Sequence, residues 1–157
     1  MSRLPPLALM LLLVSCGGNY SAPRNLDNAC SIVSQRPTYL GAMEQAERRW
    51  GVPVHVQMAT IYQESKFVGN ARTPFRYALG IIPMGRQSSA YGYSQAIDGT
   101  WDEYRRGPGR GGARRDRIED ATDFMGWYMA ETQNRLGIST FDARNQYLAY
   151  HEGRSGY

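Results

Sequence analysis

Apolar residues recur at helical spacing along most of the chain, and turn-forming residues separate these stretches. The pattern predicts a first helix over residues 38–51 and a second over 53–66, because apolar positions in both repeat every three or four residues. A long helix is expected within 116–137, where Asp116 and Glu119 form a capping box at the start and Gly137 ends the helix. A last helix is expected within 139–153. The chain should therefore be mostly α-helical.

Residues 67–97 break this helical pattern. The segment contains two prolines and four glycines, which favour turns over regular helix. A long loop or a small hairpin is expected here, and a loop of this length is uncommon in a compact domain unless it has a function. After it, Thr100 and Glu103 form the pattern of a capping box and predict a short helix that carries Trp101 and Tyr104.

The first residues have the pattern of an export signal. Arg3 supplies a positive charge, residues 4–14 are apolar, and Ser15 is a small residue at a suitable cleavage point. Residues 1–15 are therefore predicted to be a signal peptide. The run Leu-Val-Ser-Cys that ends at Cys16 is similar to the bacterial lipobox, in which the cysteine thiol receives a diacylglyceryl group. The alternative is a plain secretory signal.

Lipidation of Cys16 would hold the protein on a membrane surface without a spanning helix. Gly17 after the cysteine resembles lipoproteins that are sorted to the outer membrane, so the expected location is the outer membrane, facing the periplasm. Residues 16–37 are then a tether and N-terminal segment, and residues 38–157 are the folded domain. Cys30 would remain as a free thiol and is expected to be a small packed residue.

Composition narrows the function classes. The chain has 157 residues, 42% of them hydrophobic, and a formal net charge of +4, which fits one domain with a real core. Its single lysine, Lys66, does not follow a glycine run, and two cysteines cannot build a zinc ribbon. No metal or other cofactor is expected.

The Arg- and Gly-rich stretch 105–117 is similar to an RNA-binding box, but a solvated loop is favoured in an exported chain, so no nucleic-acid partner is expected.

Glu64 is the acidic residue in the most constrained position. It follows Thr60 and Ile61 by one turn of the second predicted helix, so it leans toward the apolar face, and it lies near the negative end of the helix dipole. Burial and the dipole both disfavour a charged carboxyl and raise its pKa, which lets a glutamate keep a proton at neutral pH and donate it to a leaving oxygen. The alternative is a solvated residue at a helix end.

Three short runs occur in a fixed order: Gln-Glu-Ser-Lys-Phe at 63–67, Gly-Tyr-Ser-Gln-Ala at 92–96, and Ala-Tyr-His-Glu-Gly at 149–153. Together they resemble the soluble lytic transglycosylase (SLT) family, lysozyme-like enzymes that cleave the glycan strands of peptidoglycan. The family's Glu-Ser pair corresponds to Glu64 and Ser65, its Gly-Leu-Met-Gln run to the second run and its Ala-Tyr-Asn-x-Gly run to the third. The third run is similar to that of a lipid-anchored subgroup.

The resemblance implies a mostly α, lysozyme-like fold of the goose-type lysozyme and SLT kind over residues 38–157, and the chemistry of a glycan lyase. Glu64 would protonate the glycosidic oxygen that leaves N-acetylmuramic acid, and then accept the proton of that sugar's 6-hydroxyl as it closes onto carbon 1. The product is a 1,6-anhydromuramoyl end, formed without water or metal. The residues implied to bind substrate are Ser65, Gly92, Tyr93, Ser94, Gln95, Tyr150 and His151.

Two features depart from the family pattern. His151 replaces the usual Asn, and the chain stops at Tyr157, where relatives generally continue into another helix, so a short or truncated member of the family is expected. Two other functions stay open: a lipid-anchored peptidoglycan-binding module without turnover, and a hydrolytic muramidase. The run 92–96 also has the form of a nucleophile elbow with Asp98 and His151 as partners, but an elbow needs a parallel sheet. A monomer is expected, with glycan strands and a membrane as its partners.

Overall fold

A computed structural model describes residues 20–157 of the chain. The predicted signal peptide, residues 1–15, and the predicted lipidation site, Cys16, lie outside the described residues. Within residues 20–157, no helix has both the length and the apolar character that are needed to cross a membrane.

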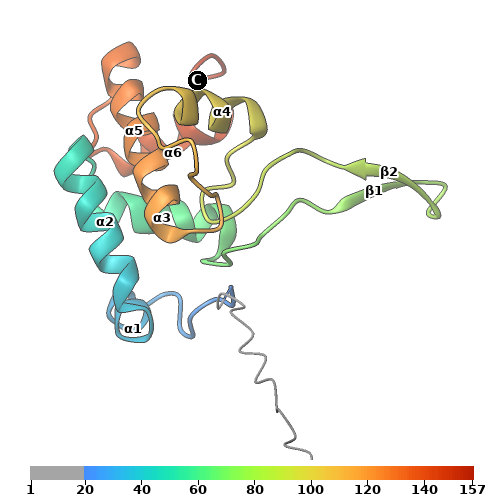
Figure 1. The fold of residues 1–157 in the computed structure, drawn as a ribbon, viewed down its shortest axis with the longest axis horizontal. Helices are drawn as coiled ribbons and strands as arrows, with labels where there is room; N and C mark the ends of the chain where they lie inside the picture. Colours follow the sequence, from blue (N-terminus) through green and yellow to red (C-terminus); the bar gives the residue numbers. More distant parts are fainter. Residues whose placement is uncertain (1–19) are drawn as a thin grey trace, which may run out of the picture.

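Six helices and one hairpin make up the described part of the chain (Figure 1). In chain order they are α1 (Ala29–Gln35), α2 (Pro37–Trp50), α3 (Val54–Ser65), β1 (Phe75–Ala78), β2 (Ile82–Arg86), α4 (Asp98–Arg106), α5 (Ile118–Leu136) and α6 (Ala143–Glu152). The strands β1 and β2 pair antiparallel in a two-stranded sheet. The structure confirms the expected mostly helical class with a small hairpin in residues 67–97.

Glycines end two of the helices as predicted. α2 is followed by Gly51 at φ 70° and α5 by Gly137 at φ 71°, and both residues are in the left-handed conformation that glycine adopts most easily. The helix starts were predicted less well. α2 begins at Pro37, whose fixed φ suits a first helical position. α6 is capped by Asp142, whose carboxylate accepts a backbone N–H at 3.1 Å.

Two predicted capping boxes are absent. α4 begins at Asp98 and therefore already includes Thr100, the predicted cap. α5 begins without a side-chain cap. Asp116, its predicted cap, instead accepts hydrogen bonds from the Tyr20 hydroxyl at 3.0 Å and from Arg114 at 2.8 Å. Tyr20, which is distant in sequence, and the neighbouring Arg114 thus bind the carboxylate that the spacing had assigned to the helix.

The core is built around α5. α2 lies so close to α5 that a Cβ at Gly126 would meet the Trp50 ring. Ring contacts with centroids 5.1–6.5 Å apart join Trp101, Tyr104, Phe124, Trp127, Tyr128 and Tyr150 into one aromatic cluster. Because aromatic pairs contribute about 0.5–1.5 kcal/mol each beyond the burial of their area, this cluster holds α4, α5 and α6 together.

The described part of the segment before α2 is packed against the domain. The Tyr20 carbonyl accepts the Gly69 N–H at 3.1 Å, and α1 lies within residues 16–37, the predicted tether and N-terminal segment. α1 buries Ile32 and leaves Cys30 exposed. The expectation that Cys30 is a packed residue is therefore wrong, because it lies on the solvent side of a short helix.

Candidate functional site

A cleft of about 240 Å³ lies where the end of α3, the residues before α4, the middle of α5 and the end of α6 meet. It is lined by Glu64, Gln95, Ala96, Ile97, Thr100, Phe124, Tyr128, Tyr150, His151, Glu152 and Gly153. Four residues that the sequence singled out, Glu64, Gln95, Tyr150 and His151, are in this lining. The fold thus brings together residues from all three of the short runs.

Glu64 reaches the cleft from the last turn of α3, one turn after the buried residues Thr60 and Ile61. Its Oε1 atom is buried and has no hydrogen-bond partner within residues 20–157. Burial raises the pKa of the Glu64 carboxyl, and the nearby His151 lowers it in part. A carboxyl that favours its protonated form and keeps one oxygen unpaired can donate its proton to a bound molecule.

Tyr150 joins α6 to the opposite side of the cleft. Its hydroxyl donates to the Ser94 carbonyl at 2.7 Å, and its ring packs edge-on against Tyr128 with centroids 5.1 Å apart. Burial raises the pKa of Tyr150 well above its usual value, and the Glu64 charge adds to the effect. The hydroxyl therefore stays protonated. It steadies the surroundings of Glu64 through the backbone of Ser94.

Residues 92–97 have an unusual backbone, and they are called the cleft wall below because residues 95–97 line the cleft and residues 92–94 support them from behind. Gly92 has φ 81°, and a Cβ at this position would collide with the Arg115 carbonyl, so glycine is required. Gln95 has φ 47°, which is uncommon for a residue with a side chain. Its Nε2 donates to the carbonyls of Ala71 at 3.0 Å and Gly92 at 2.8 Å. Strain that neighbouring bonds maintain in this way is concentrated at binding and catalytic sites.

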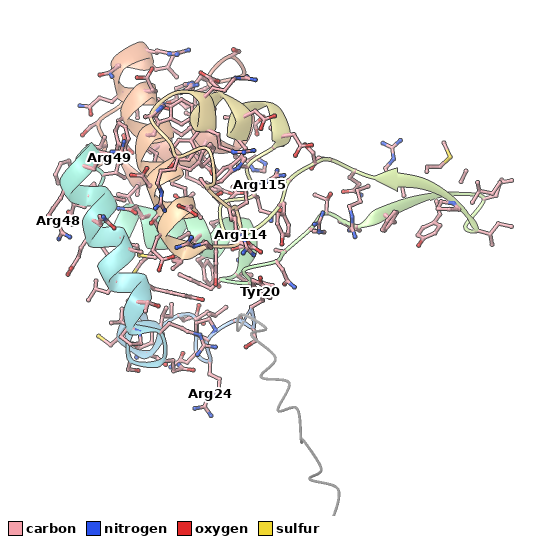
Figure 2. The ribbon with its side chains drawn as sticks, in the orientation of Figure 1. Tyr20, Arg24, Arg48, Arg49, Arg114 and Arg115 are labelled. Atoms are coloured by element: carbon pink, nitrogen blue, oxygen red, sulfur yellow. The ribbon has the colours of Figure 1, made fainter. Side chains whose placement is uncertain are left out.

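Arg115 braces the cleft wall from outside. Its guanidinium donates to two backbone carbonyls, one of them that of Ala96 at 2.8 Å, and to the Asp98 carboxylate at 2.7 Å. The side chain is only 18% exposed, and Figure 2 shows it between the helical body and the base of the hairpin. The expectation of a solvated loop over 105–117 is therefore wrong at Arg115, because the backbone of the wall needs its donors.

Four predicted binding residues lie behind the cleft and not in its lining. Ser65 is buried, and its hydroxyl donates to a backbone carbonyl of α3 at 3.2 Å. Tyr93 is buried with its hydroxyl 2.9 Å from that of Tyr39. Ser94 is fully buried, and its Oγ has no partner in the described chain. With Gly92, these residues support the site by packing and backbone shape.

Phe124, Tyr128 and Glu152 line the cleft but were not predicted to do so. Phe124 and Tyr128 are four residues apart on α5, and this spacing fits a core stripe as well as a cleft wall. Glu152 directly follows His151 in the third run. Its position next to His151 in that run could have predicted that a second carboxyl lies in the same cleft as Glu64.

The nucleophile-elbow alternative does not fit this geometry. The Ser94 side chain is fully buried, and Asp98 forms an ion pair with Arg115. The sheet found in residues 20–157 is a two-stranded antiparallel hairpin and not a parallel sheet. The same residues contain no group of three or more His, Cys, Asp or Glu side chains that could hold a metal ion.

Comparison with protein families matches residues 5–157 to the family described as Transglycosylase SLT domain. The matched range contains the whole cleft lining and all three runs at 63–67, 92–96 and 149–153. The resemblance inferred from those runs is therefore confirmed. Searches of the curated proteins and of the solved structures gave no match.

Proposed function

Since the chain belongs to the family of transglycosylase SLT domains and has its mostly helical, lysozyme-like fold, we propose that it is a peptidoglycan lytic transglycosylase. It cleaves the β-1,4 bond between N-acetylmuramic acid and N-acetylglucosamine and leaves a 1,6-anhydromuramoyl end. The observation that supports this most strongly is Glu64, whose carboxyl has a raised pKa and a buried, unpaired oxygen in the cleft.

In the first step Glu64 acts as a general acid. Burial raises the pKa of its carboxyl and so favours the protonated form, and Oε1 has no competing partner in residues 20–157. The proton passes to the glycosidic oxygen, and the bond between that oxygen and carbon 1 of the muramic sugar breaks. The negative charge left on Glu64 then stabilises the positive charge that develops at carbon 1.

In the second step the same carboxylate acts as a general base. The 6-hydroxyl of the muramic sugar attacks carbon 1, and its proton passes to Glu64 as the new bond forms. One carbon–oxygen bond has broken and another has formed within the sugar, so no water is consumed. Glu64 ends the cycle protonated, which is the form that its burial favours.

The strained cleft wall holds the sugar against Glu64 in this proposal. Gln95 keeps its backbone shape through hydrogen bonds to the Ala71 and Gly92 carbonyls, while Tyr128 offers an aromatic surface on the facing helix. His151 occupies the position of the family's Asn and lies in the lining beside Glu64. It would contact the sugar and adjust the acidity of the carboxyl at the same time.

A hydrolytic muramidase is a second candidate, because Glu152 places another carboxyl in the same cleft. Glycosidases that hydrolyse usually pair two carboxyl groups across the bond, and the second one activates a water or attacks carbon 1. A peptidoglycan-binding module without turnover is the third candidate, and it would retain the cleft but not the chemistry.

Mass spectrometry of the sugars released from purified peptidoglycan separates these candidates. Anhydro-muropeptides are expected from the parent protein, and their absence would contradict the proposal. Reducing ends would indicate a hydrolase, and Glu152→Gln should then abolish release. If nothing is released while the protein still sediments with peptidoglycan, the chain is a binding module.

The proposed substrate agrees with an anchored, exported protein. We place the mature chain on the outer membrane, facing the periplasm, as a monomer with a lipid on Cys16. The support for this placement is the sequence alone: the apolar stretch 4–14, the lipobox-like run that ends at Cys16, and Gly17.

A further inference from the structure

The hairpin formed by β1 and β2 exposes its apolar side chains to solvent. Leu79 is 90% exposed and Ile81 is 78% exposed, and they flank Gly80 at the tip. Phe75, Tyr77, Ile82 and Met84 along the strands are each about half exposed. Exposed apolar groups that lie together on a surface mark a site of interaction with a partner or a membrane.

The hairpin projects from the domain and does not pack on it. Figure 1 shows it extending from the helical body along the longest axis of the molecule, with the tip farthest out. Side chains of a strand alternate between its two faces. Tyr77 pairs with Pro83, the neighbour of Ile82, so Tyr77 and Ile82 point to opposite faces. Both are about half exposed, so both faces of the hairpin near its tip are apolar. A hairpin that docks on one protein surface needs only one apolar face.

Leu79, in the turn at the tip of the hairpin, has a backbone conformation that is unfavourable for leucine. Leu79 has φ 51° and Gly80 has φ 74°, and the Ile81 N–H donates to the Ala78 carbonyl at 3.2 Å. Two positive φ values define a turn whose first central position favours Asn, Asp or Gly. A leucine there is strained and gains no burial in compensation. Its side chain is instead 90% exposed at the turn of the hairpin.

A cationic band lies behind the apolar tip. Residues 67–97 contain Arg72, Arg76 and Arg86 and no Asp or Glu. The Arg72 guanidinium lies over the Tyr91 ring at 4.1 Å, and that of Arg86 lies over the Phe75 ring at 4.3 Å. Arginine and aromatic side chains in one band are typical of the level at which a protein meets lipid headgroups.

We propose that the tip of this hairpin, residues 79–82, inserts into the surface of an anionic lipid bilayer, with the arginines of the hairpin at the level of the phosphates. Only the turn enters the apolar layer, because the unpaired edges of a two-stranded ribbon could not be satisfied there. A second copy of the chain is disfavoured as the occupant, since paired hairpins would bring arginines against arginines. The inference does not depend on the enzymatic function.

The test uses the full chain with a tryptophan at the tip. Leu79→Trp is compared with Phe141→Trp, a matched control at a 71% exposed residue between α5 and α6. Both proteins are mixed with vesicles of phosphatidylglycerol and brominated phosphatidylcholine, because bromine quenches only tryptophans that reach the acyl chains. The quenching of the three native tryptophans, measured on the parent, is subtracted. Residues 1–19 are present in both variants and contribute equally.

The added tryptophan of Leu79→Trp should be quenched at least twofold more than that of Phe141→Trp, and Ile81→Trp should behave like Leu79→Trp. Replacing Arg76 by Gln, or using vesicles of phosphatidylcholine alone, should reduce the quenching of the tip probe. Equal quenching at positions 79 and 141 would overturn the proposal. Mass that rises with concentration in a sedimentation experiment, and returns to the monomer value in Leu79→Ser, would overturn it in favour of a second copy.

Discussion

Replacing Glu64 by Gln tests the proposed chemistry most directly. The amide has the size of the carboxyl but no acidic proton to give to a leaving oxygen. Release of anhydro-muropeptides should fall by at least about 10²–10⁴-fold, the usual contribution of general acid–base catalysis. This corresponds to roughly 2.7–5.4 kcal/mol of the barrier at about 1.36 kcal/mol for each tenfold. Because Glu64 serves in both steps, the loss should lie at the upper end of this range.

The same substitution should not unfold the protein. The buried Oε1 atom of Glu64 has no hydrogen-bond partner in the described residues, and an unsatisfied buried polar group costs about 1–3 kcal/mol. The neutral amide removes no contact that the carboxyl makes there. It also avoids the cost of burying a charge, so the melting temperature should be equal or higher and sedimentation with peptidoglycan should be retained.

The raised pKa of Glu64 also predicts in which direction the stability difference between Glu64→Gln and the parent changes with pH. Since burial raises the pKa of Glu64 above 4.5, the folded state binds a proton more tightly than the unfolded state. Glu64 therefore contributes stability below pH 4.5 that is lost as the pH rises through its raised pKa. The stability of Glu64→Gln relative to the parent should increase over that window. We would abandon Glu64 as the acid if the variant released anhydro-muropeptides at nearly the parental rate.

Three further substitutions test the surroundings of the site and the predicted anchor. His151→Asn should move the alkaline limb of the kcat/KM profile to higher pH, because His151 lowers the pKa of Glu64; a limb that moves to lower pH would contradict this. Arg115→Gln should lower the free energy of unfolding by about 1–3 kcal/mol, whereas Arg48→Gln, at a 70% exposed side chain whose ion-pair partner Glu44 is also exposed, should change it by less than about 1 kcal/mol. Cys16→Ser should abolish incorporation of labelled fatty acid, and labelling of that variant would exclude Cys16 as the lipidation site.

Local signals were sufficient where the cause of the structure is local. Gly51 and Gly137 end their helices because the left-handed conformation suits glycine. Glu64 was placed beside an apolar face because it follows Thr60 and Ile61 by one helical turn. Helical periodicity thus predicted the burial that raises the pKa of the candidate acid.

Contacts between residues that are far apart in the sequence could not be predicted from helical periodicity or from local motifs. Tyr93 belongs to a run that matches the family, but its direction is set by Tyr39, whose hydroxyl lies 2.9 Å away. Arg115 looked like one of several arginines in a glycine-rich loop, and its role as a brace depends on Ala96 and Asp98. Pairings of this kind have no periodicity, so spacing along the chain does not reveal them.

The hairpin and the cleft wall are neighbours in sequence but separate in structure. The hairpin leaves the domain shortly after Glu64 and returns at Gly92. Arg72 and Tyr91 close its base as an isolated bridge. Ala71 fastens the wall beyond that base, because its carbonyl accepts both the Gly92 N–H at 3.0 Å and the amide of Gln95 at 3.0 Å. Changes at the tip therefore have no direct contact through which to alter the wall, and membrane contact can be lost while the chemistry of Glu64 is kept.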